Sequence, residues 1–243
     1  MTLFFLKKNR IKPFFKQMIK LRENVLLQKK LLKFKRRKWN IYVFHAKRKL
    51  QKRYLKYKIK NIQGYSVTSK PNKWTGFKGK YRTILQIYKR FKLFYGLFYK
   101  SSVKKIIRKI KKKRDEKYLK LLLYKVVERR LDAVIYRSKF SYTIKSAKQH
   151  ILHGNVKVNG NIVTNPAFPL RTGDLIQLAR RSHITREILE RSFKRVWPHP
   201  PSHLNINYKT LQIIVGVINY KNLSSCFHFQ IKPENMILDF FYH

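Results

Sequence analysis

Residues 128–163, ERRLDAVIYRSKFSYTIKSAKQHILHGNVKVNGNIV, decide the fold of this chain, because they alone combine helical periodicity, a defined turn and an ordered set of basic residues. Their apolar residues recur at spacings of three and four, which is typical of helices that bury one side. This pattern predicts two short helices. The residues that set it are Leu131, Val134 and Ile135 in the first half and Ile144, Ala147 and Ile151 in the second.

The ends of the second helix and the turn after it are also marked in the sequence. Thr143 precedes this helix, where its hydroxyl can accept a hydrogen bond from a backbone N–H of the first turn. Gly154 follows the helix and suits the left-handed position just after a helix end. Asn159-Gly160 lies between two short strand-like segments and is the strongest short signal for a hairpin. The predicted order is helix, helix, hairpin.

The second predicted helix also has a polar side. Lys148 and Gln149 follow Lys145 by three and four positions, so one face presents two cations and an amide together.

This order of elements resembles the RNA-binding module named after ribosomal small-subunit protein S4, and the wider chain resembles the bacterial-type S4 family. In the module, the likeness is carried by Arg130-Leu131-Asp132, Val134, Tyr136-Arg137, Phe140, Val158-Asn159-Gly160 and Ile162-Val163. Upstream, the run Leu85, Lys89, Arg90 and Phe94-Tyr95-Gly96-Leu97 is similar to the helix that precedes the module in that family. One position departs from the family pattern: Ile144 stands where members commonly have an arginine, and the cation follows at Lys145.

The composition indicates a polyanionic partner. The chain has 243 residues, 44% of them apolar, which is enough for a folded core. Its 59 Lys and Arg residues against 10 Asp and Glu give a net charge of +49, and such self-repulsion opposes compaction unless it is neutralised. Nucleic acid suits this role because neutralised phosphates release condensed counterions. A membrane surface is the competing partner, but we find no apolar run of about 18 residues, so we predict no membrane insertion.

A single cysteine, Cys226, excludes an intramolecular disulfide and a cysteine-based zinc site. The opening MTLFFLKKNRIKPFF is basic and acid-poor like an organellar presequence, yet the same composition continues for about sixty residues. We interpret the opening as a retained basic arm.

Heavy use of Lys, Ile, Asn, Phe and Tyr is typical of A/T-rich genomes. Together with a bacterial-type family, this usage indicates translation inside an organelle. The unusual N-terminal arm favours the mitochondrial matrix, with a plastid as the alternative.

The expected fold class is α+β: a mainly helical basic domain with an inserted S4-type module, and a C-terminal β or irregular segment that packs back on the helical domain. We place the boundaries at 1–72 for a partly helical arm ordered on rRNA, 73–127 for the helical domain, 128–181 for the module and 182–243 for the C-terminal segment.

Three further patterns refine this division. Glycine, proline, serine and asparagine gather around residues 63–80 and predict a loop. An aromatic stripe predicts a core helix over residues 81–99, because such a stripe more often packs than stacks on bases. Apolar and polar residues alternate over 204–209 as in a half-buried strand.

Two patterns suggest other chemistry. An Arg-Leu-Asp triplet also carries the catalytic aspartate of pseudouridine synthases that bear this module, so an rRNA-modifying enzyme is the alternative function. Here the triplet lies in the module's first helix, where Asp132 is expected to cap or to pair with a neighbouring arginine. His150 and His153 are three positions apart, but two imidazoles without a carboxylate or thiol make a weak metal site. We predict no catalysis, no metal and no cofactor.

We predict a structural constituent of the small ribosomal subunit that binds small-subunit rRNA by charge and shape. The resemblance further implies a role in subunit assembly, contact with neighbouring small-subunit proteins, and a position near mRNA entry that affects decoding accuracy. The expected RNA-binding residues are Arg130, Arg137, Lys145, Lys148, Gln149 and His153 in the module, and Lys73, Lys78, Lys80, Lys89, Arg90, Lys104, Lys105, Arg108 and Lys109 before it.

Overall fold

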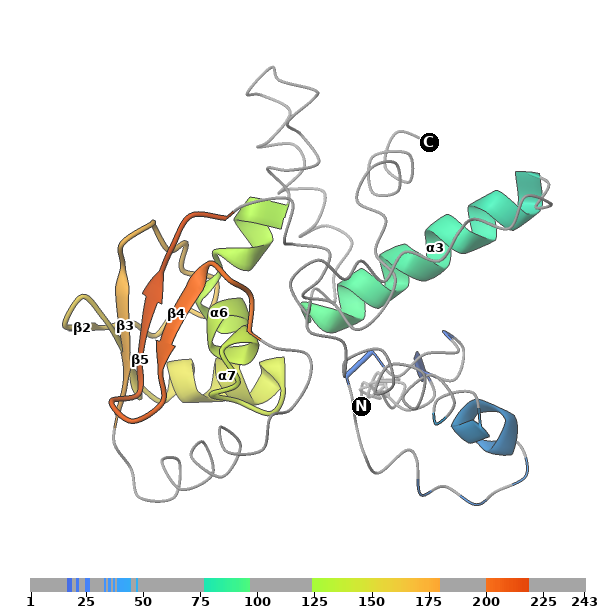
Figure 1. Cartoon of the computed structure of the whole chain (residues 1–243), viewed down its shortest axis with the longest axis horizontal. Coiled ribbons are helices and arrows are strands. Elements are labelled where there is room, and N and C mark those ends of the chain that lie inside the picture. The colour runs from blue at the N-terminus through green and yellow to red at the C-terminus, as the bar shows by residue number, and fades with distance from the viewer. Residues whose placement is uncertain are drawn as a thin grey trace, which may run out of the picture. The chain divides into compact units, whose positions relative to one another are not determined.

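The computed structural model describes residues 77–96, 124–179 and 200–218, and nearer the N-terminus only residues 17, 18, 21, 25, 26, 33, 35, 37, 39–44 and 47. For residues 77–84 it describes the backbone alone. The chain divides into two units, Met1–Ile59 and Lys60–His243, and each is described by itself. The described part of the second unit has helices and a five-stranded antiparallel sheet, an α+β arrangement (Figure 1).

In the first unit, residues 39–44 are helical. Trp39 and Tyr42, three positions apart, are buried, and their rings meet edge-on with centroids 6.5 Å apart. Most of the predicted arm, residues 1–72, lies outside the described residues. Its ordering on RNA therefore stays a prediction.

Helix α3, Phe77–Phe94, is the aromatic-striped helix predicted from the sequence, with different bounds. It begins before residue 81, so Lys78 and Lys80 belong to a helix and not to the expected loop. It ends before Gly96, whose φ of 60° is the left-handed conformation that commonly follows a helix. The stripe is buried as predicted, at Ile87, Tyr88, Phe91, Phe94 and Tyr95.

The two predicted helices of the module are α6, Leu131–Arg137, and α7, Ile144–Leu152. Thr143 caps α7, because its hydroxyl accepts a hydrogen bond from the backbone N–H of Ser146 at 3.1 Å. The predicted cap is confirmed.

Helix α7 ends in a Schellman motif. Gly154 has a φ of 68°, and its N–H donates to the carbonyl of Ile151 at 3.0 Å. The N–H of Asn155 donates to the carbonyl of His150 at 3.1 Å. These two bonds satisfy carbonyls that the helix itself leaves free, so the predicted role of the glycine is confirmed.

The predicted hairpin consists of β1, Val156–Val158, and β2, Asn161–Ile162. Asn159 and Gly160 have φ values of 50° and 87°, the positive pair that a two-residue type I′ turn requires. Strand β3, Leu175–Leu178, returns antiparallel to β1, as predicted for the end of the module.

Two further strands extend this sheet. Strands β4, Leu204–Asn207, and β5, Gln212–Val215, pair with each other, and β5 also pairs with β3, so the strand order is β2-β1-β3-β5-β4. We expected residues 182–243 to return to the helical domain. The described part, 200–218, instead joins the sheet of the module.

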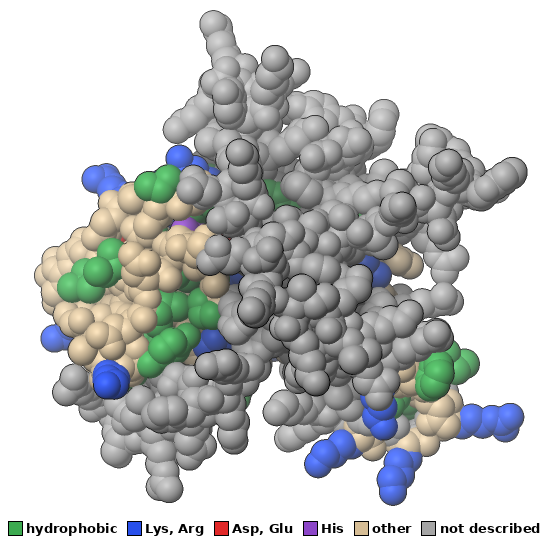
Figure 2. All heavy atoms as spheres, viewed as in Figure 1, with side chains coloured by type: hydrophobic (Ala, Val, Ile, Leu, Met, Phe, Trp, Pro, Cys, Tyr) green, Lys and Arg blue, Asp and Glu red, His purple; other side chains and the backbone are tan. Residues whose placement is uncertain are grey.

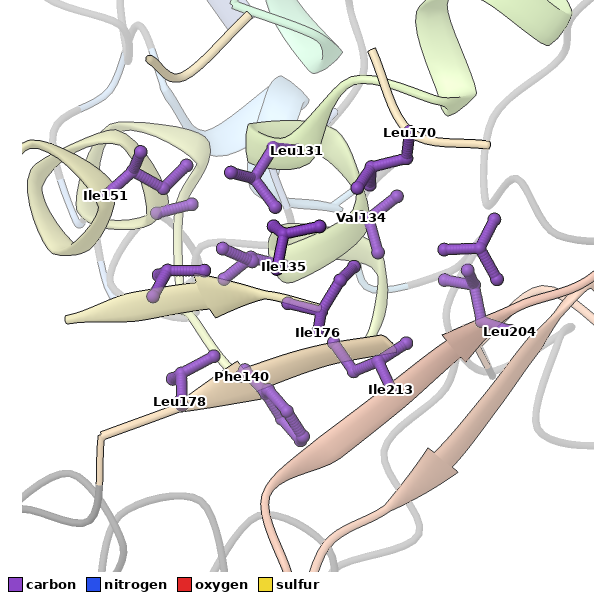
Figure 3. Close-up of a cluster of buried hydrophobic side chains, with 14 of the residues drawn as sticks. Leu131, Val134, Ile135, Phe140, Ile151, Leu170, Ile176, Leu178, Leu204 and Ile213 are labelled. Carbon is purple, nitrogen blue, oxygen red and sulfur yellow. The ribbon is translucent and has the colours of Figure 1, made fainter. Parts of the chain in front are cut away.

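One buried cluster explains this pairing. Cross-strand partners lie on the same face of a sheet. Leu204 pairs with Val215 and Ile213 with Ile176, and Leu204 and Ile213 point toward the side where the helices α6 and α7 lie (Figure 3). The cluster is formed by Leu131, Val134, Ile135, Phe140, Ala147, Ile151, Val156, Val158, Leu170, Ile176, Leu178, Leu204, Leu211, Ile213 and Val215. The C-terminal strands thus bury their apolar face in the core of the module.

Lys139, between the two helices, stands in an unfavourable environment. Its φ of 68° is left-handed, which costs a residue with a Cβ about 1–2 kcal/mol. Burial, assisted by Arg137, lowers the pKa of Lys139 to about 8. Because this folded pKa is below the unfolded value, the group adds stability as the pH rises from about 8 toward 10.5.

Lys139→Gly is therefore expected to raise the free energy of unfolding by about 1 kcal/mol at neutral pH. Glycine removes the cost of the left-handed conformation, and its greater conformational freedom in the unfolded chain offsets part of that gain. Urea unfolding followed by circular dichroism measures this change. Lys139→Ala removes the amine but keeps a Cβ and is expected to gain less. A destabilised glycine variant would contradict the assignment of strain to this residue.

Candidate nucleic-acid interface

Helix α7 presents the predicted polar face. Lys145 and Gln149 are exposed, and Lys148 has 28% of its side chain exposed. The opposite side is buried, at Ile144, Ala147 and Ile151. The helical spacing therefore placed the two sides of α7 correctly.

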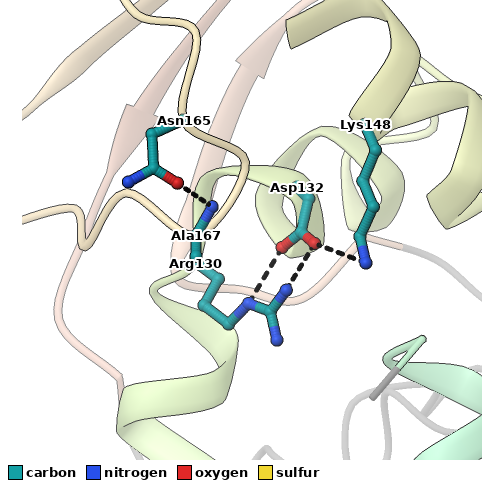
Figure 4. A network of polar contacts seen from close by, with 5 residues as sticks. All are labelled: Arg130, Asp132, Lys148, Asn165 and Ala167. Carbon is teal, nitrogen blue, oxygen red and sulfur yellow. Dashed lines mark hydrogen bonds and ion pairs between the residues drawn. The ribbon is translucent and has the colours of Figure 1, made fainter. Parts of the chain in front are cut away.

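Lys148 and Arg130, the residue just before α6, both contact the carboxylate of Asp132. Arg130 donates from Nε and Nη2 to the two carboxylate oxygens of Asp132, at 3.1 and 2.6 Å. The Nζ of Lys148 lies 3.7 Å from Oδ2 of the same carboxylate (Figure 4). The expected pairing of Asp132 with a neighbouring arginine is confirmed, and the carboxylate holds the two cations next to each other.

The side chain of Asp132 is fully buried. Burial raises the pKa of its carboxyl, while the charges of Arg130 and Lys148 oppose that rise. Because this carboxyl is fully buried and hydrogen-bonded to Arg130, it is not open to a substrate.

A loop fixes the position of this carboxylate. The first N–H groups of a helix have no partner within the helix. Here the N–H groups of Leu131 and Asp132 donate to the carbonyls of Phe168 and Pro166, both at 3.1 Å. The start of α6 is thereby anchored to the loop that contains Pro166 and Phe168.

His153 follows α7 and is exposed, at the same end of the module as Gln149. His150 lies 3.3 Å from the hydroxyl of Ser146 in its own helix. Among the residues that the structure describes, no three His, Cys, Asp or Glu side chains are grouped closely enough to hold a metal ion. In the same residues, no helix is long and apolar enough to cross a membrane.

Arg137 differs from the sequence-based expectation. Only 3% of its side chain is exposed, and its Nε lies 3.3 Å from Oε2 of Glu128. Its guanidinium carbon lies 5.4 Å from the centre of the Phe94 ring. A buried ion pair and an aromatic contact occupy this arginine, so it is not on the polar face formed with α7.

Glu128 is the centre of a buried polar cluster. The Tyr95 hydroxyl donates to Oε1 of Glu128, Arg137 pairs with Oε2, and Nε2 of His203 lies 3.9 Å from Oε2. Burial raises the pKa of Tyr95 and lowers that of His203. This cluster, Tyr95, Glu128, Arg137 and His203, joins the end of α3, the module and the C-terminal strands.

Sequence reasoning missed this role of Glu128. The signal available in the sequence was a single acid at the end of an apolar, basic segment, directly before two arginines. An isolated acid in such surroundings is a candidate for a buried partner of a cation.

The cations expected before the module are only partly described. Lys89 is exposed on α3 and Arg90 is half-buried there. Lys78 and Lys80 lie in α3, but their side chains are outside the described residues. Lys73, Lys104, Lys105, Arg108 and Lys109 lie outside the described residues altogether.

Lys and Arg side chains are not spread evenly over the module. On the face seen in Figure 2 they lie around its margin, and hydrophobic side chains, backbone and uncharged side chains fill the middle.

Comparison with known proteins gives one matching domain family and relatives of three kinds, bacterial, chloroplast and mitochondrial. The S4 domain family matches residues 129–176. The small ribosomal subunit protein uS4 of Azorhizobium caulinodans is 34% identical over 116 residues, which cover 48% of this chain and 55% of that protein. The uS4c protein of Cyanidioschyzon merolae is 34% identical over 122 residues, covering 46% and 63%. The uS4m protein of Marchantia polymorpha is 33% identical over 136 residues, covering 54% and 66%.

The helix pair, the hairpin and the matched residues define a protein with an S4-type RNA-binding domain. The chain is similar to the uS4 family of small ribosomal subunit proteins, whose bacterial, chloroplast and mitochondrial members are among the relatives named above. It spans about half the length of the bacterial relative and up to 66% of the organellar ones.

Proposed function

We propose that this protein is a structural, non-catalytic constituent of an organellar small ribosomal subunit that binds small-subunit rRNA. The observation that carries the proposal is the face formed by Arg130, Lys145, Lys148 and Gln149, with two of its cations held in place by a buried carboxylate. The names of the bacterial, chloroplast and mitochondrial relatives support it.

The face suits recognition of RNA by shape. Double-stranded RNA displays its phosphates and 2′-hydroxyls across a wide, shallow groove that side chains from a helix corner can reach. Lys145 and Lys148 supply charge-assisted contacts to phosphate, and Gln149 can both donate to and accept from a 2′-hydroxyl. Such contacts fix position and register without reading base sequence.

The alternative, an rRNA-modifying enzyme, finds less support. A catalytic aspartate must reach its substrate, whereas the side chain of Asp132 is fully buried and paired with Arg130 and Lys148. The named relatives are ribosomal proteins and not enzymes.

The finer parts of the proposal rest on the family resemblance and on composition. We place the protein in a mitochondrial ribosome, where it supports subunit assembly, contacts neighbouring small-subunit proteins and lies near mRNA entry. The basic arm, residues 1–72, becomes ordered on rRNA.

Binding to a small-subunit rRNA fragment tests the proposal. Contact with about 6 to 10 phosphates is expected to give a slope of about −5 to −9 for log K against log salt concentration. Filter binding over a range of salt concentrations measures this slope. Flotation with anionic vesicles at physiological salt is the control, and retention on vesicles that rRNA does not compete away would overturn the proposal.

A further inference from the structure

Asp132 is an acid next to the cations proposed to contact RNA. It contacts both Arg130 and Lys148, in a chain of net charge +49. A negative charge at this place weakens the attraction of the face for phosphate, so charge alone predicts that its removal tightens binding.

The geometry argues for the opposite outcome. Oδ2 of Asp132 contacts both Nη2 of Arg130, at 2.6 Å, and Nζ of Lys148, at 3.7 Å. Both nitrogens contact one oxygen atom. The side chain of Lys148, from α7, and that of Arg130, just before α6, are therefore held as a pair (Figure 4). Long cationic side chains lose much rotamer freedom when they bind, and a pair that is already fixed loses less.

Both cations remain accessible after this pairing. Arg130 has 14% and Lys148 has 28% of its side chain exposed, while Asp132 has none. The guanidinium uses two of its five N–H groups on Asp132, so others can donate to an acceptor outside the module. The arrangement suits one phosphate group, whose oxygens can accept from both cations together.

We propose that Asp132 is a positioning residue for RNA recognition, which holds Arg130 and Lys148 as a two-cation clamp for a single phosphate of the RNA backbone. This inference rests on the proposed rRNA-binding function. It assigns Asp132 a role through its neighbours and not through contact with RNA.

The test is the affinity of Asp132→Asn for the small-subunit rRNA fragment, measured by filter binding with the full chain. We expect about tenfold weaker binding, although the variant carries one more positive charge, and a salt slope reduced by about one, the loss of one phosphate contact. Asp174→Asn is the matched control: it makes the same charge change, but its side chain contacts the hairpin turn at Asn159. Its affinity is expected to stay the same or to increase slightly.

A double-mutant cycle separates positioning from a structural effect. If Asp132 acts through Lys148, Asp132→Asn is expected to add little to the loss already caused by Lys148→Met. Arg130→Lys keeps the net charge but loses the two-pronged contact, and it is expected to weaken binding by a similar factor even if Asp132→Asn does not fold.

The outcomes are distinguishable. Unchanged or tighter binding by folded Asp132→Asn, or unchanged binding by Arg130→Lys, would overturn the clamp while the proposed function stands. Failure of the wild-type chain to bind small-subunit rRNA would overturn the proposed function itself.

Discussion

Glu128→Ala is expected to lower the free energy of unfolding by about 3–5 kcal/mol, the cost of breaking a buried ion pair by removing one partner. The substitution takes the carboxylate away from Arg137, which is almost fully buried, and from the hydroxyl of Tyr95. Chemical unfolding followed by circular dichroism measures the loss. Because the cluster joins α3 to the module, we also expect a less cooperative transition.

Two variants serve as controls for this prediction. Glu128→Gln keeps an oxygen for the Tyr95 hydroxyl and is expected to lose less stability than alanine. Glu128→Leu combined with Arg137→Met replaces the pair by apolar groups and is expected to recover much of the loss. If Glu128→Ala lowers the free energy of unfolding by less than about 1 kcal/mol, the cluster does not hold these elements together.

Lys145→Glu combined with Lys148→Glu is expected to weaken rRNA binding about 100-fold, because two charge-assisted contacts worth roughly tenfold each become repulsions. Filter binding at fixed salt measures the change. The substitution at position 148 also places a second carboxylate beside Asp132, so thermal melts must accompany the binding data. Lys145→Glu alone avoids that contact and is expected to weaken binding about tenfold.

Lys157→Glu combined with Lys209→Glu is the matched control. Both lysines are exposed, one on β1 and one after β4, and the net charge changes by the same amount. The control is expected to lose only the part of its rRNA affinity that comes from long-range electrostatic attraction. If the folded α7 variant binds as well as this control, the polar face of α7 is not part of the interface.

The parts of the fold that neighbouring residues determine were predictable from the sequence. Thr143, Gly154 and the Asn159-Gly160 turn act through hydrogen bonds and φ values within a few residues, and each is found where the sequence indicates it. The two sides of α7 follow from helical spacing alone. The buried aromatic stripe of α3 follows for the same reason.

The parts that depend on distant residues were not predictable. Arg137 was predicted to bind RNA, because its partners Glu128 and Phe94 meet it only in the folded chain and nothing in the local sequence indicates them. The pairing of β5 with β3 joins segments separated by more than thirty residues, and no local pattern specifies it. The glycine, proline, serine and asparagine residues over 63–80 favoured a loop, whereas α3 begins at Phe77 and continues through Gly79, as tertiary context often overrides propensity.

We propose that the module binds small-subunit rRNA through the face formed by Arg130 and the polar side of α7, and crosslinking of the assembled protein is the most direct test. The full chain would be crosslinked to RNA in its native organelle, and both the RNA and the crosslinked peptides would be identified. We predict small-subunit rRNA joined to peptides that contain Arg130 or residues 143–153. Crosslinks of the module to another class of RNA, or to rRNA only through the outer face of the sheet around Lys157, would show that this face does not bind small-subunit rRNA.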